Sequence, residues 1–121
     1  MASNNKIVVG SNKGMIFIVN YTTKKLESVY KIHDSAIYSL SIYGGFCATG
    51  SNDNFLRVWP LDFNEFHLET KFENSVIATD IFFDGLKVAV GVSSGYIGLL
   101  DLSQKTCKTI MRTHNNEIYQ I

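Results

Sequence analysis

An internal repeat with a period close to forty constrains this chain more than any other feature. Three segments superpose: GSNKGMIFIVN from Gly10, GSNDNFLRVWP from Gly50 and GVSSGYIGLLD from Gly91. Each segment begins with Gly, passes through a polar turn and ends in an alternating apolar run, as β-hairpins do. The step from Gly50 to Gly91 exceeds that from Gly10 to Gly50 by a single position. A repeat of this length exceeds the shorter helical repeats and fits a four-stranded propeller blade.

Equivalent positions within the three segments carry residues of the same kind. The apolar sets are Ile16, Leu56 and Ile97; Ile18, Val58 and Leu99; and Val19, Trp59 and Leu100. A histidine also recurs, because His33 follows Gly10 at the same spacing at which His114 follows Gly91. In the middle repeat Phe72 takes that place.

The repeat predicts an all-β chain of about three four-stranded blades, that is, an incomplete propeller ring over residues 1–121. Strands are expected near 7–10, 15–20, 26–31, 37–42, 46–50, 55–60, 66–71, 76–82, 87–91, 96–101, 107–111 and 117–121. The blade units are 7–36, 37–75 and 76–116, with a trailing first strand at 117–121. The chain would then start at the second strand of a blade. Because closed propellers have roughly four to eight blades, we expect other blades or other chains to complete the ring.

Composition and charge argue against several classes of partner. Eleven basic residues balance eleven acidic ones, so no electrostatic footprint for nucleic acid or an anionic membrane is expected. No apolar run approaches the roughly 20 residues that span a bilayer. The N-terminal MASNNK lacks the apolar part of a secretory signal. Cys47 and Cys107 are expected to be buried thiols of a reducing compartment, with a disulfide as the alternative.

The run GSNDNFLRVWP, preceded along the chain by His33, resembles the WD40 repeat. In that family a His, an Asp, a Trp and a Ser or Thr form a buried hydrogen-bond network. The resemblance implies this role for His33, Asp53 and Trp59, with Thr49 or Ser51 supplying the hydroxyl. The Trp-Asp pair itself is altered, since Pro60 replaces the Asp. The other two repeats are degenerate, with Lys13 and Ser94 at the Asp position.

Two longer phrases, NDNFLRVWPLDFNEFHLE and DGLKVAVGVSSGYIGLLDL, resemble large centriolar and ciliary WD-repeat proteins. This resemblance implies a non-enzymatic scaffold of centriolar or ciliary (axonemal) microtubule assemblies, located in the cytoplasm and cytoskeleton at the cilium or centriole. It implies ciliary or centriolar protein partners, including tubulin. The alternative is a WD40 adaptor that binds peptides in a cytoplasmic multiprotein complex.

No catalytic, cofactor or metal site is expected. The Gly-rich turns at 10–14 and 91–95 do not match a phosphate-binding loop, because neither opens a helix. His33, His67 and His114 lie too far apart around a ring to share a metal. Asp80 is the unusual acid, because it interrupts the strand VIATDIFF. It is expected to cap a turn or accept from backbone amides.

Surface binding is therefore the expected mode of action, through loops on the rims of the propeller. The candidate partner-contacting residues are Lys13, Asn52, Asn54, Arg57, Phe63, Phe66 and Tyr96. The two loop aromatics, Phe63 and Phe66, would either anchor a partner or pack under the outer strand. Small basic spots, which could meet the acidic surface of tubulin, are formed by Lys24, Lys25, Lys105 and Lys108.

Overall fold

A computed structural model describes residues 2–3, 6–43, 45–82, 87–104 and 106–112. These residues form twelve strands in three four-stranded antiparallel sheets, and they contain no helix. The first sheet holds β1 (Ala2–Ser3), β2 (Lys6–Gly10), β3 (Met15–Asn20) and β4 (Lys25–Lys31). The middle sheet holds β5 (Ile37–Tyr43), β6 (Phe46–Ser51), β7 (Phe55–Pro60) and β8 (Leu68–Lys71). The third sheet holds β9 (Val76–Ile81), β10 (Lys87–Val92), β11 (Tyr96–Asp101) and β12 (Thr106–Arg112).

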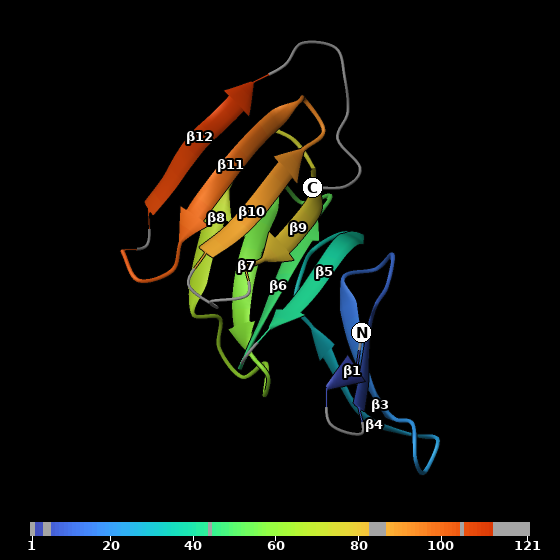
Figure 1. Ribbon diagram of the computed structural model, residues 1–121. Coiled ribbons are helices and arrows are strands. Elements are labelled where there is room, and N and C mark those ends of the chain that lie inside the picture. Colours follow the sequence, from blue (N-terminus) through green and yellow to red (C-terminus); the bar gives the residue numbers. More distant parts are fainter. Residues whose placement is uncertain (1, 4–5, 44, 83–86, 105, 113–121) are drawn as a thin grey trace.

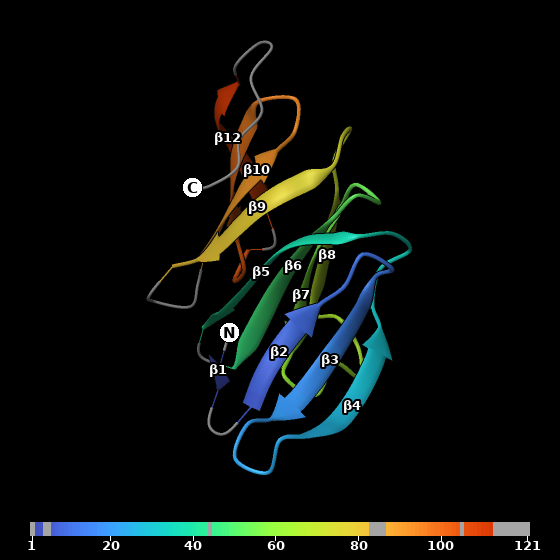
Figure 2. The same cartoon turned by 90° about the vertical axis from the view of Figure 1, so that its right-hand side faces the viewer.

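The three sheets lie one after another, with the middle sheet between the other two (Figures 1 and 2). One hydrophobic cluster joins the first sheet to the middle sheet through Ile16, Ile18, Cys47 and Trp59. A second cluster joins the middle sheet to the third through Leu56, Val58, Val88 and Leu100. The ring is not closed. Strand order follows chain order in each sheet, which confirms the expected all-β series of blades.

The turns between the second and third strands are equivalent in all three sheets. The residue before the third strand has a left-handed backbone in each: Gly14 with φ 79°, Asn54 with φ 75° and Gly95 with φ 93°. Gly and Asn tolerate this conformation better than other residues. Gly14 is also required sterically, since a Cβ there would collide with the backbone carbonyl of His33. The prediction of hairpin turns at these positions is confirmed.

The residues aligned from the sequence occupy the same register. The pairs across the second and third strands are Val19 with Ile7, Trp59 with Cys47, and Leu100 with Val88. Because side chains alternate between the faces of a strand, all three residues face the preceding side of their sheets. The period read from the sequence is therefore the period of the fold.

Three strand predictions need comment. The chain does not start at the second strand of a blade, because β1 pairs with β2 through Ala2 and Ile7. A two-residue strand has no alternation from which it could be predicted. β8 begins at Leu68, slightly later than expected. The expected trailing strand 117–121 lies outside the described residues, as does His114. No helix able to cross a membrane occurs in the part of the chain that the structure describes.

Candidate functional site

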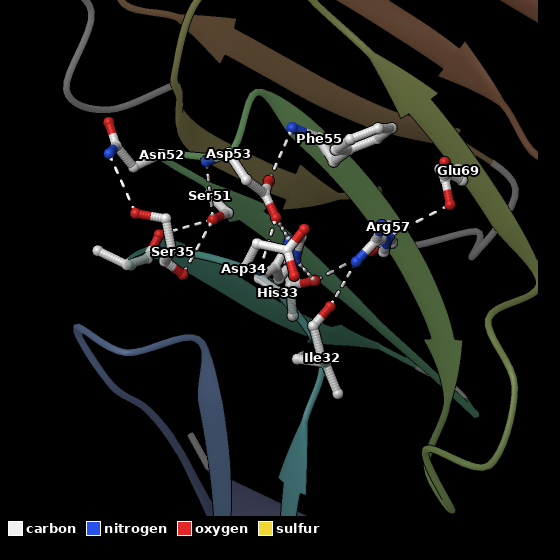
Figure 3. Close-up of polar contacts among 12 residues, drawn as sticks. Ile32, His33, Asp34, Ser35, Ser51, Asn52, Asp53, Phe55, Arg57 and Glu69 are labelled. Atoms are coloured by element: carbon white, nitrogen blue, oxygen red, sulfur yellow. Dashed lines mark hydrogen bonds and ion pairs between the residues drawn. The ribbon is translucent and has the colours of Figure 1, made fainter.

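A polar network links the first sheet to the middle sheet around His33 (Figure 3). His33 lies in the connection between β4 and β5, and its side chain is fully buried. Its Nδ1 atom is 2.9 Å from Oδ2 of Asp53, which lies in the turn between β6 and β7. Its Nε2 atom is 2.7 Å from the hydroxyl oxygen of Thr49 on β6. The connection between two blades is thus fixed to the hairpin of the second blade.

Trp59 on β7 completes the network. Its indole N–H donates to the Thr49 hydroxyl oxygen over 3.1 Å. The Thr49 hydroxyl can then donate its own proton to Nε2 of His33, while Nδ1–H of His33 donates to Asp53. Every buried donor and acceptor in this chain of hydrogen bonds is satisfied when the imidazole is neutral. A satisfied buried network of this kind favours one arrangement of the two sheets.

Two pKa values shift for identifiable reasons. Burial lowers the pKa of His33 below its ordinary 6.5, although the neighbouring Asp53 carboxylate acts in the opposite direction. Burial tends to raise the pKa of Asp53, but hydrogen bonds from the backbone N–H groups of Phe55 and Asp34 and from His33 outweigh it. The net pKa of Asp53 lies below its ordinary 3.8. The site therefore keeps a neutral histidine beside a carboxylate.

Thr49, rather than Ser51, supplies the hydroxyl between His33 and Trp59. Ser51 is fully buried as well, but its hydroxyl donates to the backbone carbonyl of Ala36 over 2.7 Å. Its oxygen also accepts the backbone N–H of Asp53 over 3.1 Å. Ser51 therefore supports the turn that carries Asp53, one step removed from the imidazole.

The Arg57 side chain, expected to be a partner-contacting residue on the rim, is bonded within the protein beside this network. Its guanidinium donates to the backbone carbonyl of Ile32 over 2.7 Å and to the Glu69 carboxylate over 3.3 Å. It also lies 4.8 Å from the centre of the Phe55 ring. Arg57 and Trp59 are separated by one residue, so strand alternation already places both on the same face of β7. The spacing of Arg57 and Trp59 in the sequence therefore indicates that Arg57 faces the network, in contrast to its expected place on the rim.

The loop between β7 and β8 separates the two candidate aromatic anchors. Phe63 is only 4% exposed, and its ring lies 5.7 Å from that of Tyr30 and 6.0 Å from that of Trp59. The prediction that Phe63 contacts a partner is therefore wrong, because its ring fills the space between two sheets. Phe66 is 40% exposed and meets the Trp59 ring edge-on at 5.7 Å.

The other rim candidates differ in what they offer to a partner. Lys13 and Asn52 are exposed. The Asn52 amide donates to the Ser35 hydroxyl over 3.1 Å and accepts from the Ser75 hydroxyl over 2.6 Å, so it links the two inter-blade connections. Asn54 and Tyr96 are half-buried, the first in its turn and the second with its ring 5.7 Å from that of Phe72. No periodic signal in the sequence indicated the serine contacts of Asn52.

The remaining reactive side chains are dispersed. Cys47 is a buried free thiol, and burial raises its pKa to about 12. Asp80 is exposed on β9. His67 lies just before β8, with its ring 5.4 Å from that of Phe46. The Cys107 side chain and Lys105 lie outside the described residues. Within the described ranges, no group of His, Cys, Asp and Glu side chains could hold a metal ion.

Comparison with solved structures identifies the architecture. The WD40 repeats of RRP9 superpose with a TM-score of 0.86 over 96% of this chain and 38% of that chain, at 10% sequence identity. Sequence relatives carry the same repeat in their names. WD repeat-containing protein 90 of Xenopus tropicalis is 32% identical over 136 aligned residues, which cover 97% of this chain and 7% of the relative. The chain belongs to the WD40-repeat family.

Two further relatives of this WD40 chain are informative. Centriole proteome protein 16 of Chlamydomonas reinhardtii is 37% identical over 109 residues, which cover 90% of this chain and 5% of the relative. Human WD repeat-containing protein 90 is 43% identical over 79 residues, 65% of this chain and 4% of the relative. The chain thus spans only a small part of the curated relatives it matches. No model of a known protein family matches the chain.

Proposed function

We propose that this WD40 chain is a non-enzymatic scaffold segment in centriolar or ciliary microtubule assemblies. The observation that carries the proposal is the 37% identity to Centriole proteome protein 16 over 90% of the chain. Similarity to WD repeat-containing protein 90 in two vertebrates supports the WD40 scaffold part of the proposal. The structure offers a rigid support for such a role, because two clusters and a buried polar network join its three sheets.

Fractionation of ciliated cells tests the proposal. A tagged copy of the chain should remain with centrioles and axonemes after detergent extraction, and imaging should place it at the cilium or centriole. Recovery of the tagged chain only in the soluble fraction would contradict the scaffold role and favour a peptide-binding adaptor. The exposed Phe66 favours that second function, because aromatic side chains on loops often anchor a partner.

Direct contact with tubulin is the finer part of the proposal. Lys24, in the turn between β3 and β4, and Lys25, the first residue of β4, are exposed and could meet an acidic surface. Co-sedimentation of the chain with microtubules should therefore weaken in the double variant Lys24→Glu/Lys25→Glu. Lys31→Glu/Lys71→Glu is the matched control, because it reverses the same number of charges on exposed lysines away from this turn. An equal loss in both variants would indicate general charge attraction rather than a site.

A further inference from the structure

The guanidinium of Arg57 is bonded within the protein, yet one of its nitrogens stays open. Nη1 donates to the backbone carbonyl of Ile32, and Nε donates to the Glu69 carboxylate. The rings of Phe55 and Phe66 lie 4.8 Å and 5.5 Å from the central carbon of the guanidinium. Among the residues that the structure describes, Nη2 has no hydrogen-bond partner and is not buried. Nη2 is therefore a donor that is held in place and faces solvent.

The Glu69 carboxylate does not use up the positive charge of Arg57. Its distance of 3.3 Å from Nε exceeds the ~2.7–2.9 Å of a strong charge-assisted hydrogen bond. The charge also acts beyond this pair, because burial lowers the pKa of His33 and the Arg57 charge lowers it further. An anionic acceptor at Nη2 would therefore match this group both in charge and in hydrogen bonding.

The exposed ring of Phe66 lies on a loop that is held at both ends. The backbone N–H of Phe63 donates to the Pro60 carbonyl over 3.0 Å, and that of His67 donates to the Val58 carbonyl over 2.7 Å. Phe63 has a left-handed backbone with φ 52°, which is costly for a bulky side chain. The loop accepts this strain and buries Phe63, and it presents Phe66 in a fixed place. A fixed aromatic ring loses little freedom when a partner covers it.

Phe55, Arg57 and Phe66 form one surface, the Arg57 surface, at the junction of the first and middle sheets. Figure 3 shows Arg57 between Ile32, which follows the first sheet, and Glu69 on β8 of the middle sheet. Both sheets of this junction are present in the chain. A preceding blade would meet the other face of the first sheet, and a following blade would meet the outward face of the third. The Arg57 surface therefore stays open in a longer series of blades.

We propose that the Arg57 surface binds an acidic segment of a partner protein. The carboxylate of an Asp or Glu side chain accepts from Nη2 of Arg57, and an adjacent apolar side chain covers the ring of Phe66. A guanidinium that is already oriented suits a carboxylate, because little of its freedom is lost on binding. The inference goes beyond the proposed function and does not depend on it, since it applies to a scaffold and to an adaptor alike.

A nuclear magnetic resonance titration of the full chain tests the proposal. The probes are the capped peptide ELDL and its amide twin QLNL, which keeps the apolar side chains but lacks the carboxylates. The reporter is the indole N–H of Trp59, because the chain has a single Trp and its ring meets Phe66 at 5.7 Å. ELDL should shift this signal to saturation. QLNL should bind at least ~10-fold more weakly, since it offers no charged acceptor.

Two variants locate the binding. Arg57→Gln, which removes the charge and the open donor, should weaken the binding of ELDL at least ~10-fold. Phe66→Ala should weaken it at least ~3-fold, because the apolar contact is lost. Tyr21→Ala is the matched control, because Tyr21 is an aromatic residue, 47% exposed, in the turn between β3 and β4. It should leave the affinity for ELDL unchanged.

The second variant and the twin peptide keep the outcome interpretable. If Arg57→Gln disturbs the junction of the two sheets, Phe66→Ala and QLNL decide. Equal affinity for ELDL and QLNL, or no saturable binding of ELDL, would overturn the proposal. So would a loss in Tyr21→Ala as large as that in Phe66→Ala, because the peptide would then not be bound at the Arg57 surface.

Discussion

The middle and third repeats bury the same three positions with different chemistry. In the middle sheet these positions hold Cys47, Thr49 and Trp59, and the Thr49 hydroxyl contacts both Trp59 and the buried side chain of His33. In the third sheet they hold Val88, Val90 and Leu100, each at most 1% exposed. The register is the same in both. A blade of this fold therefore does not require the hydrogen-bond network, because aliphatic packing serves at the same positions.

The hydrogen-bonded middle repeat and the aliphatic third repeat should respond differently to substitution. A hydrogen bond contributes a net ~0.5–1.5 kcal/mol to stability, but a buried donor or acceptor left without its partner costs ~1–3 kcal/mol. When an aliphatic side chain is shortened, the stability lost grows with the buried surface and the volume that are removed. We therefore expect the middle repeat to depend on particular atoms and the third repeat to depend on volume.

Removing the large side chain at one shared position should give the largest effects. Trp59→Ala is expected to lower the free energy of unfolding by ~3–5 kcal/mol, and Leu100→Ala by ~2–5 kcal/mol, because each leaves a cavity between two sheets. Val19→Ala, at the same register on the half-buried outer face of the first sheet, should cost less than ~1 kcal/mol. Urea denaturation measures all three. Equal losses at Val19 and Trp59 would show that burial does not distinguish the repeats.

Exchanging the side chains at the equivalent positions Thr49 and Val90 compares the two repeats directly. Thr49→Val removes the hydroxyl between His33 and Trp59 and should cost ~1–3 kcal/mol, because two buried groups lose their partner. The reverse change, Val90→Thr, should also cost ~1–3 kcal/mol, since it buries a hydroxyl in an aliphatic cluster. Val9→Thr is the control, because Val9 is 46% exposed and a hydroxyl there remains hydrated. If Thr49→Val were neutral, the network would contribute nothing to stability.

Acidification should weaken the middle repeat first. The pKa of His33 in the folded chain lies below 6.5, so the unfolded chain binds its proton first, and stability falls as pH drops below 6.5. The lowered pKa of Asp53 adds a second loss below pH 3.8. Thermal unfolding at a series of pH values should show both. His33→Phe should abolish the first slope, and an unchanged slope in that variant would assign it to another group.

Placing an acid in the third repeat should have the smallest effect. Ser94 occupies the position of Asp53, but Phe72 stands where His33 would be. Ser94→Asp should therefore change stability by less than ~0.5 kcal/mol, as expected for an exposed turn residue without a histidine beside it. Asp53→Ser, measured beside it by urea denaturation, should cost more. Equal values would mean that the carboxylate at position 53 gains nothing from the imidazole.

Much of the architecture could be predicted from residue spacing. The regular steps between Gly10, Gly50 and Gly91 and the turns that follow them indicated the three sheets. They also indicated the matched register of one apolar position, which holds Val19, Trp59 and Leu100. Local chemistry decides these features, because turn residues and alternation act over a few neighbours. The two-residue β1 escaped prediction, since so short a segment carries no pattern.

The side chains between sheets were harder to place. Thr49 and Ser51 are separated by one residue on β6 and share a face, so alternation cannot separate them, and only the position of the His33 connection does. Phe63 and Phe66 lie in one polar loop and both contact Trp59, but Phe63 also packs on Tyr30 and is buried, whereas Phe66 stays exposed.

The sequence by itself determined the period, the strands and the residue types of the network. The tertiary structure decided which hydroxyl meets His33, which aromatic is buried and that Arg57 contacts the carbonyl of Ile32. The physical reason is distance along the chain. Strands and turns depend on close neighbours in the sequence, whereas His33 and Asp53, like Arg57 and Ile32, come from different sheets and connections. Only the packing of whole sheets brings such distant side chains together.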